Sequence, residues 1–258
     1  MCLSFVVRDR IPDLPLLLLF NRDETYARPA EPLHRWPDET PAIFAGRDGE
    51  MGGTWAGTNA EGYFAMLLFV REPRREVTHS RRRGEIVPDF LRRKSEPDAF
   101  VHEMSSRANE YLHFNLIAGR VGNVLHYSNR TDEATPLGHG VHGISNGDLG
   151  EPWFKVLRGT EAIERQLESA PLDFEGYFRI LNDREEAPPE EVQHTGLPFD
   201  YERIRSPLFV MTPTYGTRTS TVVAFRRSGE VLLEERSYDS GGRRFHTVRM
   251  AVGVGKDA

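Results

Sequence analysis

The strongest constraint on the fold is an apolar run that ends abruptly in charge. Leu14–Phe20 contains five leucines and a phenylalanine, and the polar stretch NRDE at Asn21–Glu24 follows it directly. A run this apolar indicates a β-strand that is buried on both faces. The preceding segment Cys2–Val7 is rich in β-forming residues, and the segment RDRIPD supplies a turn. Together they predict an antiparallel hairpin at the start of the chain.

The predicted hairpin places the polar stretch beside the chain's single cysteine. With a turn centred near Ile11 and Pro12, the numbers of paired residues sum to about 23, so Cys2 lies across from Asn21. Cysteine at the second position is small enough for removal of Met1, which would give Cys2 a free α-amine. The ordinary alternative is a small buried cysteine next to a strand that reaches solvent. Both interpretations fit the sequence at this point.

The residue types around Cys2 suit a nucleophile that is activated by its own amine. An α-amine has a pKa of about 7.7–8.0, close to cellular pH, so it can take the proton of a neighbouring thiol. Arg22 would favour the thiolate by its charge, and Asp23 could accept hydrogen bonds from the amine. A nucleophile, a base and an orienting group would then all come from one hairpin.

The rest of the chain alternates predicted strands and helices. Further strands are predicted at Ala60–Glu72, within the hairpin Phe114–Asn129, and at Val141–Ser145, Leu208–Thr212, Thr219–Arg226, Glu230–Ser237 and Arg244–Met250. Helices are predicted at Glu85–Lys94, after an N-cap at Ser95, from Pro152 to Ser169 and at Asp173–Asn182. This order indicates an α+β fold in which helices pack on mainly antiparallel sheets.

Composition bounds the class of protein. The chain has 258 residues, of which 38% are hydrophobic, so we expect one domain over 1–258 with a flexible surface loop at 183–206. A net charge of -6 argues against a general nucleic-acid binder. The longest apolar run is too short to span a bilayer and the start lacks a signal peptide. We therefore expect a cytoplasmic protein without stable membrane insertion.

Other candidates for chemistry are few. A single cysteine excludes an internal disulfide and a zinc cluster built from thiolates. The segment HGVH at His139–His142 has no carboxylate or cysteine neighbour to complete a metal site, and we expect neither a metal ion nor a cofactor. The arginine-rich segment from Arg71 to Lys94 could receive a phosphate or carboxylate, whereas its interleaved acidic residues favour a solvated face.

Several motifs, taken in order, resemble those of a known family. They run from Met1 to about Val223 and read MCLSFVV, LLFNRDETYARPA, GGTWAGTNAEGYFAML, FNLIAG, LGHGVHGISNGDLGEPWFKV and YGTRTSTVV. By these motifs the chain is identified as a member of the NRDE family, also called the transport and Golgi organisation family. The resemblance implies an N-terminal nucleophile hydrolase-like fold, which is a four-layer αββα sandwich. It implies no single activity, because some members are linked to haem or acyl-lipid handling.

A more distant resemblance is to cysteine-type N-terminal nucleophile amidases, the group of bile salt hydrolase and penicillin V acylase. Cys2 resembles their nucleophile, Arg22 the arginine beside it and Asp23 the acidic partner. Asn146 resembles their oxyanion-hole asparagine, and Arg218 resembles a late active-site arginine by its position in the chain alone. The resemblance implies hydrolysis of a non-peptide C–N amide bond in a small or acyl-bearing substrate.

Phe69 departs from the pattern of both groups. The amidases have a second asparagine at the corresponding position, and the NRDE family commonly has LTN there, whereas Phe69 offers an oxyanion no side-chain donor. Loss of one such donor can cost about 100- to 1,000-fold in rate. The alternative function is a non-enzymatic binder or carrier of an apolar acyl or haem-like ligand. For a small-molecule or acyl-lipid ligand, the predicted contact residues are Asn21, Trp55, Phe69 and Trp153.

Overall fold

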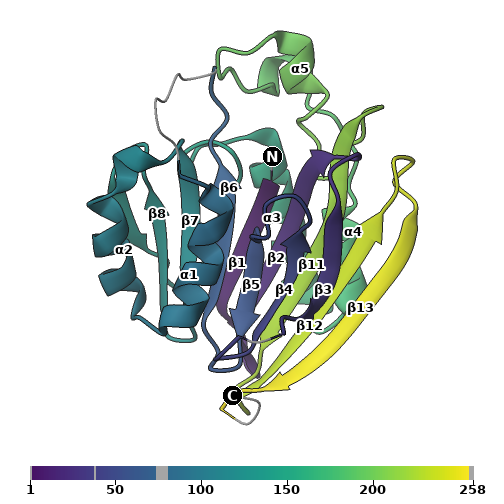
Figure 1. Ribbon diagram of the computed structural model, residues 1–258. Helices are drawn as coiled ribbons and strands as arrows, with labels where there is room; N and C mark the ends of the chain where they lie inside the picture. Colours follow the sequence, from purple (N-terminus) through teal and green to yellow (C-terminus); the bar gives the residue numbers. More distant parts are fainter. Residues whose placement is uncertain (1, 38, 74–80, 256–258) are drawn as a thin grey trace.

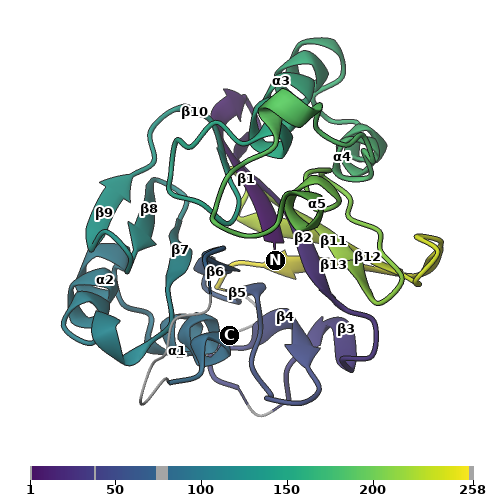
Figure 2. The same ribbon diagram turned by 90° about the horizontal axis from the view of Figure 1, so that it is seen from above.

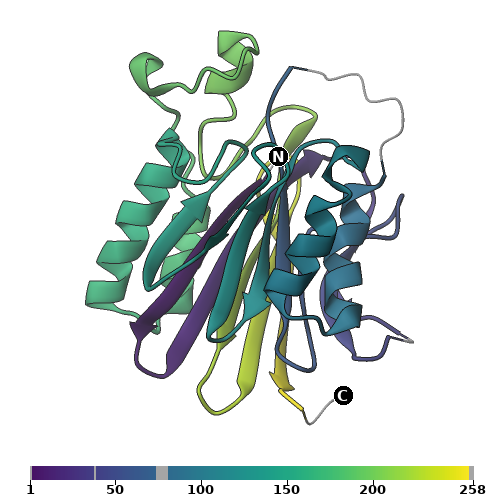
Figure 3. The ribbon, with the colours of Figure 1, turned by 90° about the vertical axis from the view of Figure 1, so that its left-hand side faces the viewer.

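Two antiparallel β-sheets pack face to face and helices cover both outer faces. The computed structural model describes residues 2–37, 39–73 and 81–255. Figure 1 shows the two sheets with the chain coloured from its start to its end, and Figure 3 shows the four layers from the side. The predicted α+β class and the αββα order of layers are confirmed.

The N-terminal hairpin lies near the middle of the first sheet. In spatial order the strands of this sheet are β10 (Gly140–Ile144), β1 (Cys2–Ile11), β2 (Leu14–Thr25), β11 (Tyr215–Phe225), β12 (Glu230–Tyr238) and β13 (Arg244–Gly253). The strand β2 is buried from Leu14 to Asp23 because it has a neighbouring strand on each side and a packed layer on each face. The apolar run is therefore explained by its central place.

The second sheet contains the shorter strands. In spatial order they are β3 (Ala30–Arg35), β4 (Ile43–Asp48), β5 (Ala56–Asn59), β6 (Phe64–Phe69), β7 (Phe114–Arg120), β8 (Asn123–Ser128) and β9 (Glu133–Pro136). The sequence patterns do not predict β3, β4, β5 or β9. None of these four strands exceeds six residues, and none has a clean alternation of apolar and polar positions.

Helices form the two outer layers. The helices α1 (Ile86–Arg93) and α2 (Pro97–Ser105) cover the second sheet, and α3 (Phe154–Ser169) and α4 (Phe174–Leu181) cover the first (Figure 3). Three single turns of 3-10 helix are η1 (Arg83–Glu85), η2 (Ala108–Glu110) and η3 (Pro189–Glu191). The short helix α5 (Phe199–Arg203) lies at the end of the sandwich where the chain begins (Figure 1).

Four details of the predicted elements differ from the structure. The N-cap of α2 is Glu96 rather than Ser95, and α3 begins only after its N-cap Trp153, so Pro152 precedes the helix. The segment Leu208–Thr212 is not a strand, and it forms one isolated bridge between Met211 and Gly216. The stretch 183–206, predicted as a loop, contains η3 and α5. No helix among the described residues is long and apolar enough to cross a membrane.

The hairpin register differs by one residue from the predicted one. Cys2 pairs with Arg22, and Leu3 pairs with Asn21. The turn lies at Pro12 and Asp13, and a β-bulge interrupts the pairing between Arg8 and Ile11, so the paired numbers sum to 24 rather than 23 along most of the hairpin. Because directly paired residues share a face of the sheet, this shift exchanges the faces assigned to Asn21 and Arg22.

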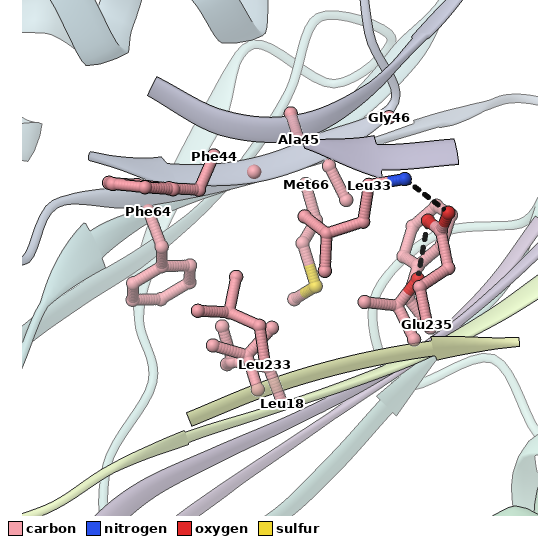
Figure 4. Close-up of a pocket in the computed structure, with 14 residues that line it drawn as sticks. Leu18, Leu33, Phe44, Ala45, Gly46, Phe64, Met66, Leu233 and Glu235 are labelled. Atoms are coloured by element: carbon pink, nitrogen blue, oxygen red, sulfur yellow. Dashed lines mark hydrogen bonds between the residues drawn. The ribbon is translucent and has the colours of Figure 1, made fainter. Parts of the chain in front are cut away.

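A buried carboxyl group bridges the two sheets. The Glu235 carboxylate on β12 accepts a hydrogen bond from the backbone N–H of Leu33 on β3 at 2.7 Å and another from Thr221 Oγ1 at 3.2 Å. Figure 4 shows this group beside an apolar cavity of about 20 Å³, lined by side chains that include Phe44, Phe64 and Met66. A cavity of this size has room for about one water molecule. This region therefore belongs to the core and offers no space for a substrate.

Candidate functional site

Cys2 occupies the first position of β1, near the middle of the first sheet. Its pairing with Arg22 places both side chains on the same face. The residue is 8% exposed and belongs to the apolar cluster between the sheets. Ser145 Oγ donates a hydrogen bond to the carbonyl oxygen of Cys2 at 2.9 Å, which fixes the start of the strand against β10.

Burial sets the resting state of the Cys2 thiol. Removal from water raises the pKa of the thiol above its ordinary value of 9.0, and the negative charge of Asp23 acts in the same direction. A hydrogen bond from the Asp23 backbone and the charge of Arg22 oppose this rise. The thiol is therefore protonated at neutral pH, and a base must take its proton before the sulfur can act as a nucleophile.

Arg22 is held between a carboxylate and an aromatic ring. Its Nη2 donates a hydrogen bond to Asp48 Oδ2 at 3.0 Å, and its guanidinium carbon lies 4.1 Å from the centre of the Trp55 ring. Arg28 Nε also donates a hydrogen bond to Asp48 Oδ2, at 2.6 Å, so this carboxylate accepts hydrogen bonds from two arginines. Within the described residues, the buried Nη1 of Arg22 has no hydrogen-bond partner. Arg22 thus presents a fixed charge and an uncommitted donor next to Cys2.

Asp23 is buried where β2 passes Cys2, and it is 2% exposed. Its Oδ1 accepts a hydrogen bond from Thr217 Oγ1 at 2.7 Å, and its carbonyl oxygen accepts one from the Tyr215 hydroxyl at 2.9 Å. Burial raises the pKa of the Asp23 carboxyl, while the positive charges of Lys155 and Arg71 hold it down. Cations that lie outside the hairpin therefore favour the charged form of Asp23, while burial keeps its pKa above the ordinary value.

Asn146 joins the two sheets at the same end of the sandwich and is 0% exposed. Its Nδ2 donates a hydrogen bond to the carbonyl oxygen of Phe69 at 2.6 Å. In return, the backbone N–H of Arg71 donates to the carbonyl oxygen of Asn146 at 2.6 Å. These two bonds attach the segment after β10 to the end of β6, and they leave Asn146 with one further amide hydrogen to donate.

A pocket of about 440 Å³ lies next to Cys2. Cys2, Arg22 and Asp23 line it together with apolar side chains, among which are Trp55, Leu67, Phe69 and Leu112. The Phe69 side chain is 38% exposed, and the Arg83 guanidinium stacks on its ring with 3.6 Å between the guanidinium carbon and the ring centre. The pocket thus combines an apolar wall with charged residues next to the thiol.

Close contact between Gly53 and Gly84 positions the arginine-rich side of the pocket. The backbone N–H of Thr54 donates to the carbonyl oxygen of Gly84 at 3.1 Å. A Cβ atom at Gly53 would lie only 2.3 Å from that same oxygen, so a larger residue could not sit there without a shift. This contact brings Arg81, Arg82 and Arg83 to the pocket.

The residues of the arginine-rich segment Arg71–Lys94 lie in different environments. Arg81–Arg83 line the pocket, while Arg71 is buried against the carboxylate of Glu202 on α5. Arg92, Arg93 and Lys94 form exposed ion pairs at the end of α1 and beyond it, as a solvated face would. Arg74 and Arg75 lie outside the described residues.

Asn21 lies on the opposite face of β2 from Arg22. Its Nδ2 donates to the carbonyl oxygens of Leu181 and Leu208 at 2.8 and 2.9 Å, and its Oδ1 accepts a bond from Ser220 Oγ at 2.6 Å. The residue is 0% exposed. The prediction that Asn21 contacts a ligand relied on the incorrect register, and the structure instead shows it fastening the helical layer to the first sheet.

Two further candidates lie outside the set of described residues that line the pocket. Arg218 Nη1 donates to the carbonyl oxygens of Thr25, Tyr26 and Arg28 at 3.0, 2.9 and 3.1 Å, and so holds the turn after β2. Trp153 is the N-cap of α3, where its Nε1 donates to Glu151 and the Arg71 guanidinium carbon lies 4.9 Å from its ring centre. Neither side chain is among those that line the pocket beside Cys2, and the buried Asn146 lies behind that lining as well.

Sequence reasoning missed two of the charged residues behind Asp23, which are Lys155 and Glu202. Asp23, Arg71, Lys155 and Glu202 form what we call the buried charge cluster, since each is no more than 4% exposed and their charges interact. A signal for Lys155 exists in the sequence, because 155, 159, 163 and 167 follow the helical spacing of the buried face of α3. Glu202 lies in a stretch without periodicity and gives no such signal.

Comparison with known proteins places the chain in one family. A family model described as Transport and Golgi organisation 2 matches residues 1–240. The Transport and Golgi organization protein 2 homolog of Bos taurus is 33% identical over 258 residues, covering 92% of this chain and 93% of the relative. The Homo sapiens homolog is 31% identical over 259 residues, with the same coverage of 92% and 93%.

Two solved structures have the same fold. A mutant of the conjugated bile acid hydrolase from Clostridium perfringens matches with a TM-score of 0.55 and 9% sequence identity, over 99% of this chain and 93% of that one. The N-acylethanolamine-hydrolyzing acid amidase ortholog of Caenorhabditis elegans matches with a TM-score of 0.51 and 13% identity, over 86% and 92%. At these identities the likeness shows the fold alone, which is that of the N-terminal nucleophile hydrolases.

Proposed function

The chain belongs to the Transport and Golgi organisation 2 family, and we propose that it is an N-terminal cysteine hydrolase acting on a non-peptide C–N amide bond. The substrate is a small or acyl-bearing molecule. The proposal rests on the position of Cys2, at the start of a central strand, paired with Arg22 and lining a pocket of about 440 Å³. The names of two proteins with this fold, an acid amidase and a conjugated bile acid hydrolase, support the reaction class.

The proposed reaction starts with removal of Met1, which frees the α-amine of Cys2. The neutral amine takes the thiol proton, and the sulfur attacks the carbonyl carbon of the substrate amide. As the C–N bond breaks, the ammonium returns the proton to the leaving amine, and a thioester forms on Cys2. The amine then deprotonates a water molecule, which attacks the thioester and releases a carboxylic acid and the thiol.

Three groups are available to assist this reaction. The free amide hydrogen of Asn146 and the unpartnered Nη1 of Arg22 are donors for the negative oxygen of the tetrahedral intermediate. In this proposal Asp23 orients the amine through its carboxylate, as the orienting group of a catalytic triad does, and its burial beside the pair of Cys2 and Arg22 supports this role. Phe69 supplies no side-chain donor, and its exposed ring instead offers contact to the acyl part of a substrate.

The proposal is tested with fluorogenic N-acyl amides that carry short, medium and long acyl chains. Protein that has lost Met1 should release the fluorescent amine, and Cys2→Ala should abolish release. Asn146→Ala should lower kcat by about 100- to 1,000-fold, the effect of losing one oxyanion donor. If Cys2→Ala releases amine as fast as the wild type, Cys2 is not the nucleophile and the proposal fails.

The apolar wall of the pocket favours one second candidate function. Trp55, Leu67, Phe69 and Leu112 all line the pocket, and such an apolar lining suits a binder or carrier of an acyl or haem-like ligand. Titration with a fluorescent fatty acid and with haemin separates the two functions. The carrier function would be favoured if the protein cleaves none of the amides and if Cys2→Ala binds the fatty acid or haemin as tightly as the wild type.

A further inference from the structure

Lys155 is a buried lysine that the proposed reaction leaves without a role. It lies in the first turn of α3 and is 0% exposed, which is rare for a lysine. Its Nζ has no hydrogen-bond partner within the described residues. An ammonium buried without a partner is costly to the folded state, so this position needs an explanation other than stability.

The charges that surround Lys155 come from four separate elements. They are Asp23 on β2, Cys2 on β1, Arg71 after β6 and Glu202 on α5. Burial is the main cause that lowers the pKa of Lys155 to about 8, and Arg71 acts in the same direction; the negative charges of Asp23 and Glu202 oppose this, as does Cys2 when its thiol is ionised. The positive end of the α3 dipole also disfavours a cation in the first helical turn.

Within this group, Arg71 and Glu202 neutralise each other. The two side chains form a direct ion pair and are 2% and 1% exposed. Glu202 Oε2 also accepts a bond from Gln193 Nε2 at 3.0 Å, and Glu202 Oε1 accepts one from Thr195 Oγ1. Among the negative groups that act on Lys155, Asp23 has the largest effect, and Lys155 is the cation beyond the hairpin that acts most strongly on Asp23.

We propose that Lys155 is a positioning residue for the nucleophile, acting through Asp23 on the amine that takes the Cys2 proton. This inference rests on the proposed function. The Lys155 charge keeps the Asp23 carboxylate ionised, so that it can hold the amine in place. Lys155 is also a second cation near the amine, so its charge lowers the pKa of the α-amine. The neutral amine, which is the base, is then present nearer to neutral pH.

The experiment follows alkylation of Cys2 by iodoacetamide across a pH series, using protein that has lost Met1. Lys155→Met should raise the midpoint of the alkylation profile by about one pH unit and slow alkylation at neutral pH by about tenfold. Lys155→Arg, which keeps the charge, should restore part of the rate. Lys94→Met is the matched control, since Lys94 is exposed and pairs with Glu61, and its profile should equal that of the wild type.

Thermal unfolding separates a positioning role from a structural one. Methionine fills a similar volume without a charge, so Lys155→Met should keep or raise Tm. Loss of folding in both Lys155→Met and Lys155→Gln would overturn the inference, because the lysine would then be needed for stability. An unchanged alkylation profile in folded Lys155→Met would also overturn it and leave the proposed function intact. If wild-type Cys2 is not alkylated, the proposed function itself fails.

A double mutant tests whether Lys155 acts through Asp23. In the Asp23→Asn background the carboxylate is absent and only the direct effect of the Lys155 charge on the amine remains, so adding Lys155→Met should slow alkylation by clearly less than the roughly tenfold expected in the wild-type background. A full tenfold effect of Lys155→Met in that background would show that the lysine acts by another route.

Discussion

Asp23 and Glu235 are two carboxyl groups buried in the same sandwich, in very different surroundings. Asp23 is 2% exposed at the end where the chain begins, and its charge is supported by Lys155 and Arg71. Glu235 is also 2% exposed, but it lies between the sheets, where a backbone N–H and a threonine hydroxyl are its hydrogen-bond donors (Figure 4). Burial raises the pKa of Glu235 to about 7.

The difference lies in what each group can reach. Asp23 lines the pocket beside Cys2, whereas Glu235 faces an apolar cavity with room for about one water molecule. Figure 2, viewed from above, shows the chain start near the middle of the molecule at the end that α5 covers in part. A buried charge can thus serve chemistry or hold two layers together, and burial alone does not tell which. The predictions below separate the two cases.

The largest effect is expected from Asp23→Asn. The amide keeps the shape of the side chain and can still accept the bond from Thr217, but it has no charge to orient the amine. Turnover of the best N-acyl amide should fall by about 1,000-fold, within the range of a general-base contribution. The matched control is Glu235→Gln, an equivalent change at the other buried carboxyl group, which should alter turnover by less than about twofold.

The second prediction concerns the pH dependence of stability. The pKa of Glu235 is about 7 in the folded protein, whereas its ordinary value is 4.5. Between pH 4.5 and about pH 7, Glu235 is therefore protonated in the folded state and ionised in the unfolded state. The stabilisation is fully present below about pH 4.5 and is lost as the pH rises through about 7. The difference corresponds to about 3 kcal/mol. Glu235→Gln should therefore be more stable than the wild type at about pH 8, by up to this amount.

Urea unfolding at about pH 5 and about pH 8 measures this effect. Leu33 supplies the carboxylate's backbone donor, and a glutamine oxygen can accept the same bond. Equal pH dependence in the wild type and in Glu235→Gln would show that Glu235 does not titrate between these two pH values.

A smaller loss of stability is expected from Asn21→Ala. This change leaves the carbonyl oxygens of Leu181 and Leu208 without their side-chain donor in a buried place. The free energy of unfolding should fall by about 2 kcal/mol. Alkylation of Cys2 in the folded variant should proceed at the wild-type rate, because Asn21 faces the helices. A large fall in the alkylation rate with unchanged stability would instead place Asn21 at the site.

The smallest effect is expected from Arg218→Ala. Its guanidinium holds three backbone carbonyls of the turn after β2, in a partly exposed position. We expect a loss of about 1 kcal/mol in urea unfolding and a change of less than about twofold in amide turnover. If turnover instead fell by about 100-fold or more, Arg218 would act as the late active-site arginine that the amidase resemblance implies.

Much of the fold can be predicted from the sequence, because the long strands have strong local patterns. Leu14–Phe20 is apolar throughout, and the turn residues before it force a hairpin. The exact pairing cannot be predicted in this way, since the turn lies at Pro12 and Asp13, one residue later than predicted, and the β-bulge between Arg8 and Ile11 offsets part of this change, which leaves a net shift of one residue. That shift determines whether Asn21 or Arg22 faces Cys2.

Prediction of the site has a similar limit. Cys2, Arg22 and Asp23 are neighbours across one hairpin, so local reasoning brings them together. Lys155 and Glu202 reach the same place from distant segments, α3 and α5, and only tertiary packing reveals that they meet. A lysine at a helix start is commonly solvated, and nothing local to Lys155 says that Asp23 is near.

The central claim is that Cys2 is a reactive residue with a free α-amine, and the most direct test is a mass measurement on the purified protein. The intact mass should equal that of the chain without Met1. Treatment with an electrophilic thiol probe at neutral pH should then add one label to the peptide that begins with Cys2. Retention of Met1 would contradict the account, and so would a folded protein whose Cys2 stays unlabelled while the same chain in urea is labelled.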